Sequence, residues 1–128
     1  MKKTVLLGWE LGAGFGHINP MIRVASALAA DGHRIVFALR DVIGPWSAVK
    51  KTEWPVLIAP TYTCPAVADG RPTCTIADIL GHHGYATTDT LAPLVRAWDG
   101  ILAGTRPDLV IADYSPTLTL AAAGRVPV

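Results

Sequence analysis

One short segment near the start of the chain places a histidine between glycines and a helix start. The segment is Gly14-Phe15-Gly16-His17-Ile18-Asn19-Pro20. Glycine lets another group approach the backbone closely. The first turn of a helix offers free N–H groups and a partial positive charge, which favour a phosphate or a developing anion. Histidine exchanges a proton near neutral pH, so His17 is a candidate general base. Substrate contacts are predicted for four neighbours in the segment: Gly14, Phe15, Gly16 and Asn19.

A carboxylate that could orient this histidine follows a later apolar run. Residues 109–112 are Leu-Val-Ile-Ala, and Asp113 comes directly after them. An aspartate that accepts a hydrogen bond from one imidazole nitrogen fixes the tautomer, so the other nitrogen can take a proton from a substrate hydroxyl. We predict a catalytic pair of His17 and Asp113, with Tyr114 as a substrate contact beside it. The alternative role for Asp113 is an N-cap of the helix that begins near Pro116.

The elements that must position these side chains alternate between strand and helix. Short apolar runs predict buried strands at 4–9, 35–39, 56–59 and 109–112. Apolar residues at helical spacing predict helices over 20–32 and 88–102, a short helix within 42–51 and another over 116–124. This order predicts the α/β class, a Rossmann-like open parallel sheet with flanking helices. Ligands bind beyond the carboxyl ends of such strands, which places the loops after Trp9 and Ala112 at one sheet edge.

Several local signals sharpen these boundaries. Asn19 is predicted to cap the first helix, with Pro20 as its first residue. Thr88 or Asp89 is the expected cap of the third helix, and the phase of Trp98 on that helix predicts a core residue. Residues 60–71 predict a loop, and 126–128 are typical of the opening of another strand.

Composition excludes several classes of function. The chain has 128 residues, enough for one domain, and a formal charge of +1 without basic or acidic runs. It therefore lacks the electrostatic footprint expected of a protein that binds nucleic acid or an anionic membrane. No apolar run reaches the roughly 18 residues of a membrane helix, and Glu10 interrupts the signal-like opening too early. Two cysteines are too few for a disulfide framework, so we expect a cytoplasmic protein.

The sequence resembles a known family in three places. Gly16-His17-Ile18-Asn19-Pro20-Met21, with the stretch 28–33 and the strand after it, resembles the opening of the family-1, UDP-sugar-dependent glycosyltransferases. Residues 107–113 resemble the strand and aspartate found later in that family, and 124–128 resemble the strand that follows. The likeness covers nearly the whole chain, although 42–86 matches only in the rhythm of its elements.

The resemblance implies the GT-B fold and an inverting transfer without metal or cofactor. A sugar would pass from UDP-sugar or a related nucleotide sugar, as co-substrate, to a hydroxyl of a small-molecule acceptor. His17 would be the base and Asp113 its orienting partner. Residues 1–128 would be a truncated N-terminal, acceptor-side domain. The C-terminal donor-binding domain would be absent, because family members run to roughly three times this length. Alone, the chain is expected to transfer little or no sugar.

Three other interpretations of the sequence remain open. Gly12-x-Gly14-x-Gly16 is not the G-x-G-x-x-G of a dinucleotide-binding oxidoreductase, although Asp41 follows the second strand where a ribose-binding acid would lie. Glu10 could contact the acceptor, or be an ordinary solvated carboxylate at a strand end. A zinc site is possible only from residues that lack paired metal-ligand spacing: Cys64, Cys74, His82 and His83.

A non-catalytic role is the main alternative to catalysis by a complete enzyme. The chain could be an acceptor-binding domain that pairs with a separate donor-domain chain in a split glycosyltransferase. Its hydrophobic content is 51%, and missing elements would leave apolar surface uncovered. Such a surface favours a partner chain or self-association. Tyr62 and Trp46 are further candidates for lining an acceptor pocket.

Overall fold

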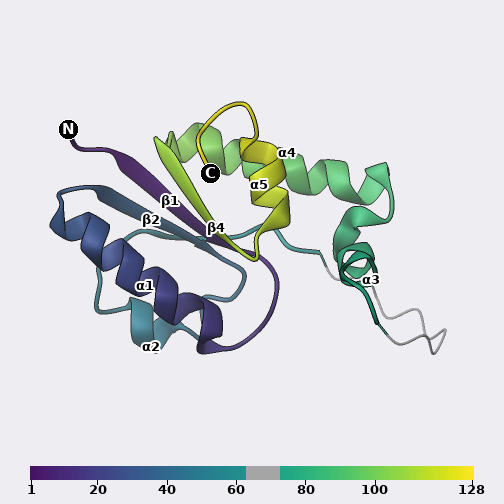
Figure 1. Cartoon of the computed structure of the whole chain (residues 1–128), viewed down its shortest axis with the longest axis horizontal. Coiled ribbons are helices and arrows are strands. Elements are labelled where there is room, and N and C mark those ends of the chain that lie inside the picture. Colours follow the sequence, from purple (N-terminus) through teal and green to yellow (C-terminus); the bar gives the residue numbers. More distant parts are fainter. Residues whose placement is uncertain (63–72) are drawn as a thin grey trace.

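A parallel four-stranded sheet organises the protein. The computed structural model describes residues 1–62 and 73–128, and the strands lie in the order β3-β2-β1-β4 (Figure 1). The strands are β1 (Thr4–Trp9), β2 (Arg34–Leu39), β3 (Val56–Ile58) and β4 (Leu109–Asp113). The helices are α1 (Phe15–Ala30), α2 (Trp46–Val49), α3 (Ile76–Leu80), η1 (Gly81–Tyr85), α4 (Thr88–Thr105) and α5 (Pro116–Ala122). The predicted α/β class is confirmed.

Helices cover both faces of the sheet (Figure 1). Successive side chains of a strand point to opposite faces, and the core divides accordingly. Leu7 packs in a cluster with Met21 of α1 and Val49 of α2. Leu6 packs in a second cluster with Trp98 of α4 and Leu118 of α5. Trp98 is completely buried, which confirms its predicted place in the core.

The register of β1 determines where the two chemically interesting loops begin. Trp9, the last residue of β1, pairs with Leu39 of β2 on one side and with Asp113 of β4 on the other. Both pairings are parallel, so the three strands end at one level. The loops that follow β1 and β4 therefore leave the sheet side by side, as the alternation of elements predicts.

Helix α1 begins earlier than the sequence predicts. Gly14 is its N-cap, with φ +79°, and the helix starts at Phe15 without a side-chain cap. The prediction that Asn19 caps this helix and that Pro20 opens it is wrong. Gly14 adopts a backbone conformation that few other residues tolerate, so the chain turns directly from the loop into the helix. His17 consequently lies in the first helical turn and not in the loop.

The middle of the chain differs more from expectation. Helix α2 is four residues long, shorter than the predicted range of 42–51. Thr87, and not Thr88 or Asp89, caps α4 by accepting a hydrogen bond from the Thr90 N–H. Helices α3 and η1 were not predicted, although Thr75 and Asp78 form a capping box at the start of α3. Most of the loop predicted for 60–71 lies outside the described residues.

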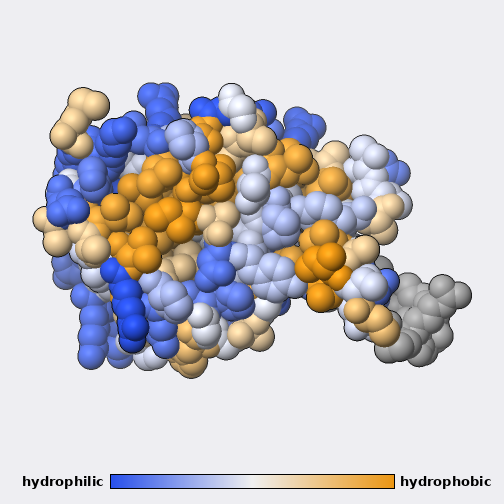
Figure 2. All heavy atoms as spheres, in the orientation of Figure 1, coloured by the Kyte–Doolittle hydropathy of each residue, from blue (hydrophilic) through white to orange (hydrophobic). Residues whose placement is uncertain are grey.

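β4 is the last strand in the order of the sheet, and apolar surface lies beside it. Pro127 is not part of a strand, but its carbonyl accepts a hydrogen bond of 2.9 Å from the Val110 N–H. Leu109 and Ile111 of β4 are only partly buried, and Val128 is 55% exposed. Figure 2 shows hydrophobic side chains gathered between α1 and β4. Within the described part of the chain, no helix combines the length and apolar character needed to span a membrane.

The packing of α5 on β1 gives a first prediction. A Cβ added at Gly8 of β1 would collide with Leu118 of α5 and lie 3.4 Å from Trp98. We expect Gly8→Ala to lower the free energy of unfolding by about 1–3 kcal/mol, as overpacking of a core does. Urea unfolding measures the change.

The matched control for this prediction is Gly100→Ala on α4. A Cβ there meets no atom within 4 Å, so alanine should leave stability unchanged or raise it by up to about 1 kcal/mol. Equal stability of the Gly8→Ala variant and the natural protein would contradict the described approach of α5.

Candidate functional site

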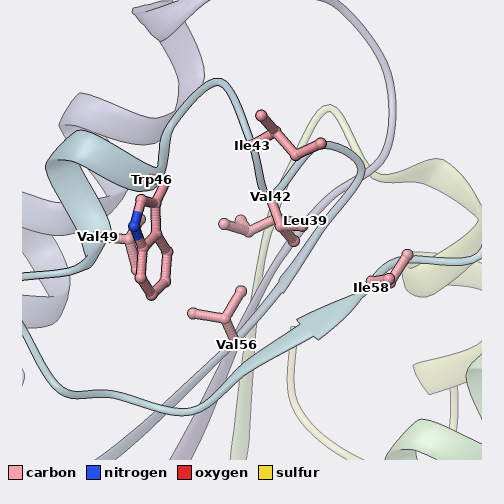
Figure 3. Close-up of a pocket in the computed structure, with 7 residues that line it drawn as sticks. All are labelled: Leu39, Val42, Ile43, Trp46, Val49, Val56 and Ile58. Carbon is pink, nitrogen blue, oxygen red and sulfur yellow. The ribbon is translucent and has the colours of Figure 1, made fainter.

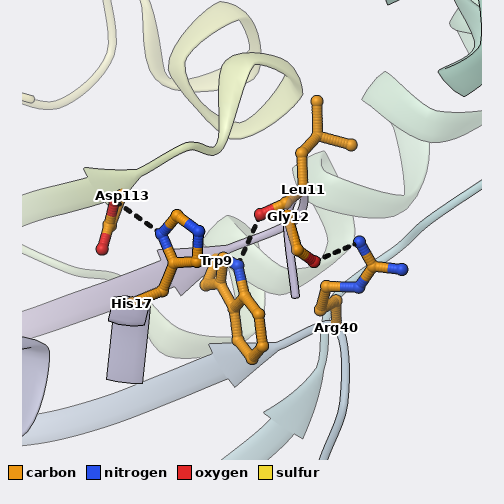
Figure 4. Close-up of polar contacts among 6 residues, drawn as sticks. All are labelled: Trp9, Leu11, Gly12, His17, Arg40 and Asp113. Atoms are coloured by element: carbon orange, nitrogen blue, oxygen red, sulfur yellow. Dashed lines mark hydrogen bonds and ion pairs between the residues drawn. The ribbon is translucent and has the colours of Figure 1, made fainter. Parts of the chain in front are cut away.

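The structure brings the two predicted catalytic side chains together. His17 is the third residue of α1 and Asp113 is the last residue of β4. The His17 Nδ1 atom lies 3.2 Å from Asp113 Oδ1 (Figure 4). The side chains are 25% and 36% exposed, so the pair is ordered against the sheet edge yet open to a ligand. Asp113 does not cap α5, whose N-cap is Ser115.

Aromatic rings fix the orientation of the imidazole. The indole of Trp9 stacks on the His17 ring with centroids 5.5 Å apart and an interplanar angle of 22°. The ring of Tyr114 is tilted by 31° at 5.9 Å. Sequence reasoning assigned Tyr114 to this site but missed Trp9, because the last residue of an apolar strand carries no signal of a polar partner. The two rings and the Asp113 carboxylate thus all contact the imidazole.

The second imidazole nitrogen faces a glycine. When Nδ1–H donates to Asp113, Nε2 is left as the proton acceptor. A Cβ added at Gly12 would lie 2.5 Å from His17 Nε2, and Gly12 has φ +85°. Arg40 Nη1 donates a hydrogen bond of 2.6 Å to the Gly12 carbonyl (Figure 4). The missing side chain at position 12 thus leaves room beside the nitrogen that would act as base.

Glu10 lies in the interior and not in solvent. Glu10 is only 2% exposed, so the prediction of a solvated carboxylate at the strand end is wrong. Oε2 accepts a hydrogen bond of 3.0 Å from the Thr117 N–H, and Oε1 accepts one of 2.8 Å from the Leu118 N–H. Burial raises the pKa of Glu10 above its ordinary value, and this effect outweighs the two N–H donors, which lower it. The structure directs this carboxylate to the start of α5, where each of its oxygens accepts a backbone hydrogen bond.

The remaining predicted contacts lie at the exposed start of α1. Phe15 is 49% exposed, and Gly14 and Gly16 both border open space. Asn19 is exposed further along the helix. Phe15 and Trp9 line a small pocket of about 40 Å³ together with residues of the β2–α2 loop. The helix start and this pocket adjoin the side chain of His17.

A larger cavity lies at the ends of β2 and β3. Its volume is about 520 Å³ and its lining is almost entirely apolar (Figure 3). The lining residues are Leu39, Val42, Ile43, Trp46, Val49, Val56 and Ile58. Trp46 was a candidate for an acceptor pocket, and its indole forms one wall here. His17 does not line this cavity. The β2–α2 loop contributes residues to this cavity and to the small pocket beside Trp9.

Two of the residues considered for other chemistry, Asp41 and His83, have structural partners. Asp41 Oδ1 accepts hydrogen bonds from the N–H groups of Ile43 and Gly44. His83 Nδ1 donates to the Tyr62 carbonyl at 2.9 Å. Cys64 lies outside the described residues. Among those that are described, no three His, Cys, Asp or Glu side chains are grouped so as to hold a metal ion.

Solved structures of glycosyltransferases resemble this chain. No protein-family model matches the chain, and no curated protein matches it either. The calicheamicin glycosyltransferase CalG4 superposes with a TM-score of 0.59 and 22% identity over 95% of this chain. MurG of Acinetobacter baumannii gives 0.60 and 15% over 94%. A glycosyltransferase of Rickettsia africae gives 0.59 and 14% over 94%.

These similarities establish the fold of the chain. It has the α/β fold found in GT-B glycosyltransferases. The chain spans only 30%, 32% and 27% of the length of the three similar structures. At these identities the comparison concerns the fold alone, so the function must be argued from the site.

The burial of Glu10 gives a prediction about pH. The pKa of Glu10 in the folded protein is raised above 4.5. At a pH between 4.5 and this folded pKa, Glu10 is therefore protonated in the folded protein but ionised in the unfolded chain. Stability contributed by this group is therefore fully present below 4.5 and is lost as the pH rises through the folded pKa. Relative to Glu10→Gln, the natural protein should gain unfolding free energy as the pH falls from neutrality toward 4.5.

Urea unfolding of both proteins across this pH range measures the difference. Subtracting the curve of the glutamine variant removes the contributions of the other titrating groups. A difference in unfolding free energy that does not vary with pH would show that the carboxyl group is not desolvated.

Proposed function

We propose that this chain is the acceptor-side, N-terminal domain of an inverting glycosyltransferase. The enzyme would transfer a sugar from a nucleotide sugar, such as a UDP-sugar, to a hydroxyl of a small molecule. The observation that carries the proposal is the His17–Asp113 contact at the carboxyl edge of a parallel sheet. The similar fold of three glycosyltransferases supports it.

The chemistry assigned to each residue follows from the geometry. His17 Nε2 takes the proton of the acceptor hydroxyl while the acceptor oxygen attacks the anomeric carbon of the sugar. The bond from that carbon to the nucleoside diphosphate breaks, and the diphosphate leaves with the electron pair. Asp113 accepts the Nδ1–H hydrogen bond throughout and stabilises the imidazolium that forms. Attack opposite the leaving group inverts the anomeric configuration.

The proposal assigns the sugar donor to another domain. The small pocket is lined by Trp9, which stacks on His17, and by Phe15 at the exposed start of α1. We assign these surfaces to the acceptor. The partly buried Leu109 and Ile111 on the α1 face of β4 support pairing with further protein. This feature also favours the alternative, a domain that binds an acceptor and pairs with a separate donor-domain chain.

Removing the base is the direct test of the proposal. In an enzyme that contains this domain together with a donor-binding domain, His17→Ala should lower turnover at least about a hundredfold, the usual contribution of a general base. Asp113→Asn should also lower it, because the correct tautomer is no longer enforced. Release of nucleoside diphosphate from UDP-glucose in the presence of phenols and alcohols measures the rate.

The matched control is His33→Ala. His33 directly precedes β2, at the amino ends of the strands and therefore at the other end of the sheet from His17. Its Nδ1 accepts a hydrogen bond from the Lys3 N–H. This variant should retain its activity. Comparable activity in the His17 variant would refute the assignment of the base.

The space beside Nε2 gives a second test. Gly12→Ala would place a methyl group against His17 Nε2, in the space assigned to the acceptor hydroxyl. We therefore expect kcat/KM to fall at least about tenfold, which corresponds to ~1.4 kcal/mol in the activation free energy. Gly32→Ala is the control, because Gly32 has the same φ of +85° but no atom within 4 Å of an added Cβ. Both variants carry the same backbone strain. Equal activity of the two would contradict the assignment of this space to the acceptor.

A further inference from the structure

The loop that carries Asp113 depends on contacts with the end of β1. His17 in the first turn of α1 and Asp113 at the end of β4 are 96 residues apart in the sequence. Hydrogen bonds from the residues just after β1 also join the two segments. The Leu11 N–H donates a hydrogen bond of 3.0 Å to the Tyr114 carbonyl. The Glu10 carboxylate accepts hydrogen bonds from two N–H groups of α5, one to each oxygen.

The start of α5 lacks a cap of its own. Ser115 occupies the N-cap position, and serine is a favoured cap, yet its side chain makes no cap hydrogen bond. Its buried Oγ has no hydrogen-bond partner among the residues that the structure describes. The first N–H groups of α5 are satisfied by Glu10, which comes from the other loop. A local cap would serve the helix equally well, but it would not connect α5 to β1.

The segment between Asp113 and α5 needs such a connection. Tyr114 has φ +47°, a left-handed conformation that a non-glycine residue keeps only where its surroundings enforce it. Its carbonyl is held by Leu11, and the residues after it are held by Glu10. Thr117, whose N–H donates to Glu10, also connects α5 to η1, because its hydroxyl accepts a hydrogen bond of 3.1 Å from Tyr85. Glu10 thus lies at the centre of contacts among three segments around the site.

A buried carboxylate is a costly way to cap a helix. Removing a charged group from water is unfavourable unless hydrogen bonds compensate for it. Here the serine next to α5 could supply the same hydrogen bond without a charge. The connection between the two loops is what the glutamate provides and the serine does not.

We propose that Glu10 is a positioning residue that holds the β4–α5 loop so that Asp113 meets His17. It does not touch the acceptor or the reacting atoms. Its role is to keep the Asp113 carboxylate at Nδ1, and thereby to keep the proton of the neutral imidazole on that nitrogen. The catalytic consequence rests on the proposed function, whereas the geometric claim concerns this chain alone.

The tautomer of His17 tests this role without any measurement of activity. Long-range ¹H–¹⁵N spectra of the 128-residue chain at about pH 8, above the ordinary titration range of histidine, distinguish Nδ1–H from Nε2–H. We expect a single Nδ1–H form in the natural protein. Asp113→Ala gives the reference spectrum for a lost contact, and Glu10→Gln should shift His17 most of the way toward that spectrum. Glutamine has the same shape as glutamate but only one accepting oxygen.

The control variant weakens α5 without touching Glu10. Ala121 lies on the buried side of α5, and its replacement by glycine lowers the stability of the helix through backbone entropy. It should leave the tautomer of His17 unchanged. If Glu10→Gln does not fold, Glu10→Asp keeps the charge with a shorter reach and should give an intermediate shift.

Each outcome is decisive. An unchanged tautomer in Glu10→Gln overturns the proposal, and so does an equal shift in Glu10→Gln and Ala121→Gly, which would indicate general loosening of α5. If the natural protein itself does not show the Nδ1–H form, the His17–Asp113 pair is contradicted, and with it the proposed function.

Discussion

The parallel pairing of β1 with β4 is the constraint on which the site depends. It sets Trp9 level with Asp113, so the loops after the two strands leave the sheet together. Asp113 then needs only the short reach of its own side chain to meet His17 in the first turn of α1. The glycine at position 8 belongs to the same arrangement, because it lets α5 pack directly on β1. A shift of one residue in this register would move Asp113 to the opposite face of the sheet.

Much of the fold could be predicted from the sequence, because strands buried on both faces are recorded as short apolar runs. The four strands follow from that pattern, and the core position of Trp98 follows from its phase on α4. The start of α1 did not, because Asn19-Pro20 is a strong helix-start signal that the conformation of Gly14 overrides. In α3 and η1 the helical spacing of apolar residues lasts for a single turn, Ile76, Ile79 and Leu80, which is too short to predict a helix. The stronger signal was the capping box of Thr75 and Asp78.

The site was predictable only in part, and for a similar reason. His17 and Asp113 follow elements whose order fixes where they emerge, so topology alone indicates that they approach each other. Glu10 was misread because its partners, the N–H groups of residues 117 and 118, lie more than a hundred positions away. Trp9 and Gly12 were missed because stacking and close approach depend on three-dimensional distances that residue type does not encode.

The stacked indole of Trp9 has an electronic consequence for the chemistry proposed here. The face of an indole ring carries negative electrostatic potential and attracts cations within about 6 Å. The centroid of the Trp9 ring lies 5.5 Å from that of the His17 imidazole. A base that accepts a proton becomes a cation for the remainder of the reaction. The positive charge would then lie between a carboxylate at its edge and a π system against its face, and neither group would need to move to receive it.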